Sequence, residues 1–166
     1  VVPPLLTEFF MQGFVNYGVK QSSGIKHKII PDGLIHKLYD LVWQRVERFN
    51  RTAGTFRYFT PFESVFSKAN QAEKVISLNA QFGEGWMLPA EILSLASQNV
   101  RHVISMQPFG CIANHIVSKG IENRIKQLYP DMHLLSLDFD SGISEVNIIN
   151  RLLLFIDNLK HESIKS

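Results

Sequence analysis

The sequence predicts an α/β protein with a helical N-terminal portion over residues 1–72 and three βα units over residues 73–160. Short apolar runs at 74–78, 102–106 and 134–138 have the length and composition of strands that are buried on both faces. Helical patterns separate these runs, and strands that alternate with helices form a parallel sheet covered by helices. We therefore expect three layers around a small parallel sheet, within a single α/β domain over residues 1–166.

The composition narrows the class of protein. The 166 residues are 45% hydrophobic and 19% charged, which is enough apolar material to fill one core. The 17 Lys and Arg residues exceed the 15 Asp and Glu residues by only two and form no cluster of five or more basic residues, so no nucleic-acid partner is expected. One cysteine excludes an internal disulfide and favours a reducing compartment, so a cytoplasmic location is expected.

The N-terminus predicts neither a signal peptide nor a membrane anchor. Residues 1–15 are apolar, but they lack a basic leader, include Glu8 and are too short to span a bilayer. We therefore expect no membrane partner. Since the chain does not begin with methionine, we also expect it to be a fragment of a longer protein.

The first half of the chain contains three expected helices. The first opens on Pro3-Pro4 and ends at Gly18, and its aromatic face is either core or docking surface. The second begins with Asp32 as its cap and carries an apolar stripe. A capping-box spacing in Thr60-Pro61-Phe62-Glu63 predicts a third helix that runs to Gln71. The apolar stripe of the second helix consists of Ile35, Leu38, Val42, Val46 and Phe49.

Three further helices are expected after the strands, over residues 84–97, 111–129 and 142–159. In an open parallel sheet, ligands bind beyond the carboxyl ends of the strands. The loops that follow the three predicted strands are therefore the candidate site, and we expect them to meet at one rim of the sheet.

The second of these loops, Gln107-Pro108-Phe109-Gly110-Cys111, contains the only cysteine. Pro108 and Gly110 should end the strand, which places Cys111 in the first turn of a helix. A thiol there faces free backbone amides and the positive end of the helix dipole, which favours a thiolate that binds metals or attacks electrophiles. The alternative is a cysteine that packs as a small hydrophobic residue.

Asn114 and His115 follow the cysteine by three and four residues, on the same face of the expected helix. A nucleophilic Cys/His pair is sterically conceivable. Hydrogen-bonded scaffolding is the favoured role for His115, because catalytic pairs usually draw their members from separate elements.

The first loop contains Gly83, Glu84 and Gly85 just before a helix, where backbone amides could bind a phosphate or a CoA moiety. The full dinucleotide fingerprint is absent, so a plain turn is the competing interpretation. Glu84 could act as a general base or orient a ligand, or it could stabilise the helix N-terminus.

The third loop offers Asp138, Asp140 and Glu145, which could hold a hard cation such as Mg²⁺. Capping of the next helix by Asp140 or Ser141 is the favoured interpretation.

Together, the three loops resemble the C-terminal region of the large CoA-substrate-specific enzyme activase proteins related to (R)-2-hydroxyglutaryl-CoA dehydratase and its activator. The resemblance covers roughly residues 74–160 and extends loosely to the helical first half. Ala113 and Ser141 stand where the family pattern has proline. The matching motifs are Gln81-Phe82-Gly83-Glu84-Gly85-Trp86, Gln107-Pro108-Phe109-Gly110-Cys111 with Asn114-His115, Asp138-Phe139-Asp140, and Ser144-Glu145-Val146-Asn147 with Asn150-Arg151.

The resemblance implies a redox function. In relatives, the portion similar to the dehydratase subunits carries a [4Fe–4S] cluster held by cysteines, while a separate actin-like module hydrolyses ATP. Such systems drive low-potential electron transfer to a dehydratase that removes water from 2-hydroxyacyl-CoA through a radical. Only Cys111 can be carried over as a cluster ligand, so the other thiolates would come from outside this chain.

These implications define the expected site and partners. Cys111 is the expected metal ligand, and the residues expected around the cofactor are Gly83, Glu84, Gly85, Asn114 and His115. The partners implied are ATPase and cluster-binding domains of the same protein and a CoA-substrate dehydratase, and the fragment alone should be inactive. The alternative function is a non-catalytic α/β docking module or one that binds CoA or phosphate.

Overall fold

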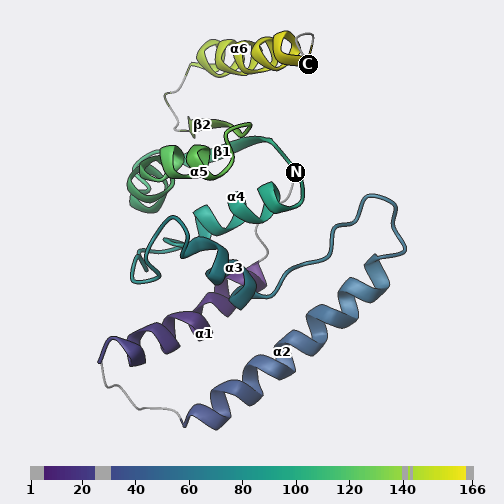
Figure 1. The fold of residues 1–166 in the computed structure, drawn as a ribbon, viewed down its shortest axis with the longest axis vertical. Coiled ribbons are helices and arrows are strands. Elements are labelled where there is room, and N and C mark those ends of the chain that lie inside the picture. The colour runs from purple at the N-terminus through teal and green to yellow at the C-terminus, as the bar shows by residue number, and fades with distance from the viewer. Residues whose placement is uncertain (1–5, 25–30, 140–141, 143, 164–166) are drawn as a thin grey trace. The chain divides into compact units, whose positions relative to one another are not determined.

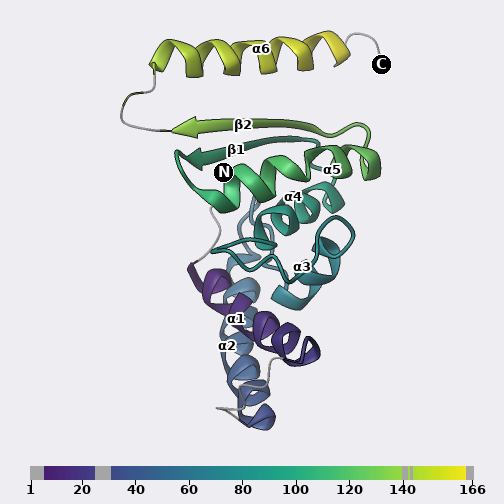
Figure 2. The same cartoon turned by 90° about the vertical axis from the view of Figure 1, so that its left-hand side faces the viewer.

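The computed structural model describes residues 6–24, 31–139, 142 and 144–163 (Figures 1 and 2). The chain divides into two compact units, Val1–Ser94 and Leu95–Ser166. This boundary falls inside helix α4 (Met87–Ser97). Across the described residues, no helix combines the length and the apolar character needed to cross a lipid bilayer.

The first unit is helical. It contains α1 (Leu6–Ser22), α2 (Asp32–Ala53), α3 (Val65–Ala72) and most of α4, and α1 contacts both α2 and α3. Trp86 lies fully buried just before α4, where its indole Nε1 donates a hydrogen bond to Asn16 Oδ1 over 2.8 Å. The buried core of this unit consists of Met11, Val15, Val65, Ala69, Ala72, Trp86, Met87 and Ala90.

The first two helices agree with the prediction in position, but α1 continues past the expected stop at Gly18 to Ser22. Val19 packs against the core, and this burial outweighs the modest cost of a glycine inside a helix. The expected start at Pro3-Pro4 lies outside the described residues. Helix α2 has Asp32 as its first residue, as predicted within one position, and Pro31 occupies the N-cap.

The prediction for the start of α3 is wrong by several residues. Ser64 is the N-cap, and its Oγ accepts a hydrogen bond from Ser67 N over 3.1 Å. The side chain of Asn50 on α2 both donates to Phe62 O and accepts from Phe62 N, each over 3.0 Å. These two bonds use the backbone groups of Phe62, so the helix begins only after them and Thr60 does not cap it.

The first predicted strand, at 74–78, is also wrong, because this segment forms turns. The amides of Lys74, Val75 and Ile76 donate back to carbonyl oxygens at the end of α3. Val75 is buried, and Ile76 and Leu78 pack against the helical core. The apolar run therefore reflects burial among helices rather than a place in a sheet.

The second unit contains the sheet and confirms a mixed α/β chain. Two strands, β1 (His102–Pro108) and β2 (His133–Phe139), pair in parallel in the register His102↔His133 to Pro108↔Phe139. Between them lie the π-helix η1 (Ala113–Ser118) and the helix α5 (Glu122–Leu128), and α6 (Glu145–Ser163) follows β2. The described residues thus form a small two-stranded parallel sheet instead of three βα units.

One face of the sheet carries the contacts with η1 and α5. Ser136 of β2 donates to Glu122 on α5 over 2.7 Å, and Asp138 binds Lys119 just after η1. Gln107 is paired with Asp138 and is fully buried. On the opposite face, Ile104 is 43% exposed and Met106 is 68% exposed. One face of the sheet thus leaves much of its apolar surface open to solvent.

Candidate functional site

The candidate site lies at the carboxyl end of β1. Beyond the last paired residues, Phe109 N donates to Phe139 O over 2.8 Å, which extends the ladder by one bond. Gly110 then adopts a φ of +78°, a backbone conformation that glycine adopts without steric cost. The chain reverses there and enters the helical segment, so Cys111 lies at the junction between strand and helix.

Cys111 is half-buried, and its backbone is fixed on both sides. Its amide donates to Pro108 O over 3.2 Å, and its carbonyl oxygen accepts from His115 N over 3.0 Å. The buried side chain of Asn114 donates from Nδ2 to Cys111 Sγ over 3.1 Å. Hydrogen bonds to ionised acceptors are stronger than those to neutral ones, so this donor interacts most strongly with a thiolate.

The segment after Cys111 is a π-helix. At its end, Lys119 N donates to Asn114 O, five residues earlier, which is the bond that defines the wider turn. Short π-helical turns are rare and are frequent at functional sites. Here the turn contains Asn114 and His115, both of which contact Cys111.

His115 links the cysteine loop to β2. Its Nδ1 lies 2.9 Å from Cys111 O, and its Nε2 lies 3.2 Å from Asp138 Oδ1. Lys119 Nζ lies 3.1 Å from Asp138 Oδ1 and 3.0 Å from Asp138 Oδ2. Since neither ring nitrogen is directed at Cys111 Sγ, the arrangement is that of a scaffold rather than of a nucleophilic Cys/His pair.

Gln107, four residues before the cysteine, has unused hydrogen-bonding capacity. Within the described residues, neither its Nε2 nor its Oε1 has a partner, although the side chain is fully buried. Leaving a buried polar group unsatisfied costs about 1–3 kcal/mol. Because of this cost, a buried amide without a partner is unusual in a strand, and here it lies in the strand that leads to Cys111.

The third loop contributes one residue to this site. Asp138 is held by Lys119 and His115, whereas Glu145 begins α6 with an exposed side chain. The predicted caps at Asp140 and Ser141 lie outside the described residues. No three His, Cys, Asp or Glu side chains lie close enough to hold a metal ion in the described parts of the chain.

The first loop belongs to the other unit and is a closed turn. Gly83 and Gly85 have positive φ angles of 59° and 22°. The amides of Gly85, Trp86 and Met87 donate to Phe82 O, Ala80 O and Glu84 O, so they are already used within the loop. A phosphate would have to compete with these bonds. Within the second unit, the side chains that form the surroundings of Cys111 are Asn114, His115 and Asp138.

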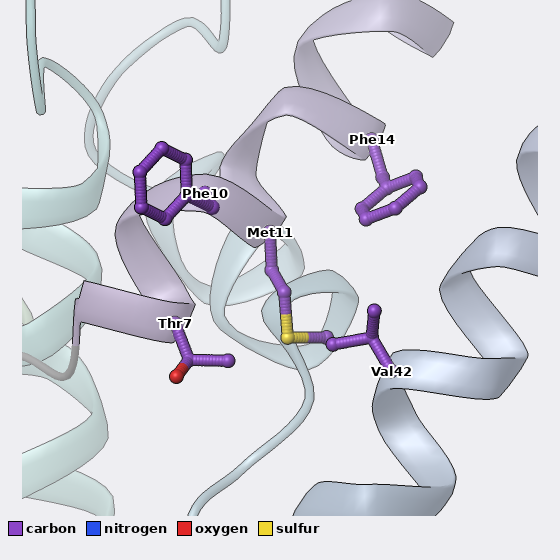
Figure 3. A pocket seen from close by; sticks show the side chains of 5 residues that line it. All are labelled: Thr7, Phe10, Met11, Phe14 and Val42. Carbon is purple, nitrogen blue, oxygen red and sulfur yellow. The ribbon is translucent and has the colours of Figure 1, made fainter.

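The aromatic face of α1 is divided between core and surface. Met11 and Val15 are core residues, while Phe9 and Phe10 are exposed. Phe10, Met11 and Phe14 line a pocket of about 370 Å³ together with Thr7 of α1 and Val42 of α2. Figure 3 shows Met11 reaching toward Val42.

Two features of the structure were not predicted from the sequence. Lys119 follows His115 by four residues, and this helical spacing was a signal that the two side chains share a face, where the structure has both at Asp138. In the first unit, the buried Lys68 Nζ lies 2.7 Å from Glu8 Oε1 and 2.6 Å from Glu91 Oε1. No local pattern signals this second cluster, because its three members come from three helices.

The cluster shifts the pKa values of two of its members. Burial raises the pKa of Glu91, and the charge of Lys68 offsets this only in part. Burial alone would lower the pKa of Lys68, but Glu91 and Glu8 together raise it above the ordinary value. The charged ammonium is thus the form that this buried site stabilises.

Comparisons of the chain with protein-family models, with curated proteins and with solved structures found no match. The side chains around Cys111 and the sequence motifs therefore carry the functional assignment.

Proposed function

We propose that this chain is the C-terminal domain of a CoA-substrate-specific enzyme activase, or of a related 2-hydroxyacyl-CoA dehydratase-like protein. In this proposal, Cys111 contributes one thiolate to a [4Fe–4S] redox site. The observation that carries it is the hydrogen bond from Asn114 Nδ2 to Cys111 Sγ at a half-buried strand-to-helix junction. Donors to sulfur are among the features by which proteins tune such sites.

The residues present fit a single ligand position. Cys111 is the only thiol in the chain, so the remaining ligands would come from other domains of the same protein. When bound, a cluster of this kind transfers single electrons at low potential. The chain itself would orient the sulfur through Asn114 and hold the loop to β2 through His115 and Asp138.

The partners follow from the same proposal. They would be the ATPase and cluster-binding domains of the same protein and a CoA-substrate dehydratase, in the cytoplasm. CoA or phosphate binding at Gly83, Glu84 and Gly85 is the less favoured function, because three amides of that loop donate internally.

We also propose that α6 covers the open face of the sheet in the assembled protein, which would complete a three-layer arrangement. Arg151 of α6 already donates to Ser136 O of β2 over 2.7 Å. Ile104 and Met106 leave apolar surface on that face. The helix α6 carries apolar side chains around much of its circumference, and a helix of this kind is normally covered by other parts of a protein. The exposed ones are Val146, Ile149, Leu153, Leu154 and Ile156.

The cluster proposal is tested by anaerobic reconstitution of the complete protein with iron and sulfide. Cys111→Ser should lower the iron bound per protein, because serine replaces one thiolate. Ile112→Ala is the matched control, since this neighbouring side chain is exposed and should leave the iron content unchanged. Equal iron content in Cys111→Ser and wild type would show that Cys111 is not a required ligand.

A further inference from the structure

The loop between α2 and α3 carries exposed aromatic residues beside arginines. Phe49 at the end of α2 is 54% exposed, and Phe56 and Tyr58 in the loop are 70% and 87% exposed. Together with Arg57 they line a shallow hollow of about 550 Å³. Large aromatic side chains clustered in solvent mark binding sites, because folding leaves their apolar area unburied.

Three arginines give this surface a positive charge. Arg57 lies in the loop, with its guanidinium 5.3 Å from the centre of the Tyr58 ring. Arg45 and Arg48 lie one helical turn before Phe49 and Thr52, on the same side of α2, and both are exposed. The sequence from residue 48 to residue 62 contains neither Asp nor Glu. We call Phe49, Phe56, Tyr58, Arg45, Arg48 and Arg57 the aromatic–arginine surface.

The loop that presents this surface is held in place from beneath. Asn50 binds both backbone groups of Phe62, and Phe59 N donates to Phe56 O over 3.1 Å. The rings of Phe49, Phe59 and Phe62 lie with each pair of centroids 5.8 Å apart. These contacts fix the loop without covering Phe56 or Tyr58, so a partner would lose little loop entropy on binding.

We propose that the aromatic–arginine surface docks a partner protein through a segment that places an apolar side chain in the hollow between flanking Asp or Glu residues. Aromatic residues and arginine are the types most enriched at protein interfaces and at their energetic hot spots, whereas lysine is depleted there. Arginine pairs with carboxylates through two parallel hydrogen bonds, which matches an acidic segment. This inference does not depend on the function proposed for Cys111.

Two other anionic partners fit the surface less well. A lipid bilayer is flat, whereas the hollow is concave and is lined by apolar side chains. A single-stranded nucleic acid needs ring faces free for base stacking, but Phe49 and Phe59 are engaged edge to face. The net charge of the chain is only +2, which provides little general attraction for a polyanion.

Selection from a phage library of random 16-residue peptides on the immobilised chain tests the proposal. The enriched peptides should combine acidic residues with an apolar residue. Synthetic copies should bind at least tenfold more weakly to Phe56→Ser/Tyr58→Ser and to Arg57→Glu, and more weakly at high salt. The controls are Phe82→Ser and Lys37→Glu, at exposed positions of the same unit, which should bind as wild type does.

All variants alter exposed side chains, so an unchanged melting temperature would show that each one folds. The proposal is overturned if no enriched peptide distinguishes the surface variants from the controls. It is equally overturned if the surface variants lose binding only to phosphatidylserine vesicles or only to a single-stranded oligonucleotide. Those outcomes would assign the surface to a membrane or to a nucleic acid.

Discussion

Asn114 Nδ2 donates a hydrogen bond to Cys111 Sγ over 3.1 Å, and the peptide carbonyl of the same asparagine closes the π-helical turn by accepting from Lys119 N. One buried residue thus links the backbone geometry of η1 to the electrostatic surroundings of the only thiol. The wider turn uses the backbone of Asn114, and the sulfur contact uses its side chain.

Replacing Asn114 should change the redox behaviour of the proposed site. A donor to sulfur stabilises the more negative, reduced state, so Asn114→Ala should make the reduction potential of the reconstituted complete protein more negative. The reduction potential of Asn114→Ser, which retains a short donor, should fall between those of Asn114→Ala and wild type. Potentiometric titration followed by EPR measures the effect. An identical potential in Asn114→Ala and wild type would remove this tuning role from Asn114.

The buried ion cluster of the first unit should be sensitive to loss of its cation. Lys68→Met would leave the buried Glu8 and the half-buried Glu91 without their cationic partner, and breaking such a buried pair costs about 3–5 kcal/mol in the free energy of unfolding. Lys74→Met is the control, because Lys74 is exposed. Urea denaturation compares the two variants. If Lys68→Met lowers the free energy of unfolding no more than the control does, the cluster does not stabilise the fold.

The raised pKa of Glu91 predicts a pH dependence of stability. Because burial raises this pKa in the folded state, the folded protein binds the proton more tightly than the unfolded chain. The contribution of Glu91 to stability is therefore full below the ordinary carboxyl pKa of 4.5 and declines as pH rises through the raised value.

Glu91→Gln should remove this decline, so its free energy of unfolding relative to wild type should increase with pH above 4.5. Glu73→Gln, at an exposed position, should show no such trend. Parallel pH curves for Glu91→Gln and wild type would rule out the predicted linkage.

Gly85 should not tolerate a side chain. A Cβ at this position would lie 1.9 Å from Ala80 O, so Gly85→Ala requires the backbone to move. At Gly83 the φ of 59° is also positive, but no atom lies within 4 Å of a Cβ. Gly83→Ala should therefore cost only about 1–2 kcal/mol, and Gly85→Ala clearly more, in thermal or urea unfolding. Equal losses would mean that the contact with Ala80 is relieved at no cost.

The fold was predictable where helix formation or strand pairing agreed with the local pattern. Residues 102–106 and 134–138 form strands as expected, and each strand is two residues longer than the expected run. The tripeptide Val-Ile-Ser occurs both at 75–77 and at 103–105, yet only the second copy is a strand. The difference arises because β1 has β2 as a neighbour, whereas the first copy packs against helices.

The candidate site was predictable in its local part. Spacing placed Asn114 and His115 near Cys111, and the structure has Asn114 at its sulfur and His115 at its carbonyl oxygen. The contact of Asp138 with Lys119 spans 19 residues and depends on the pairing of two strands, so spacing alone could not reveal it. The helix start predicted from the capping box at Thr60 was wrong for a similar reason. The side chain of Asn50, on another helix, binds the backbone groups of Phe62.

The ligand role of Cys111 is tested most directly by the EPR spectrum of the reconstituted and reduced complete protein. If Cys111 supplies one thiolate, Cys111→Ser should lose the reduced-cluster signal or shift its g values, because oxygen replaces sulfur at one iron. A Cys111→Ser spectrum identical to that of wild type, at equal iron content, would contradict the proposal.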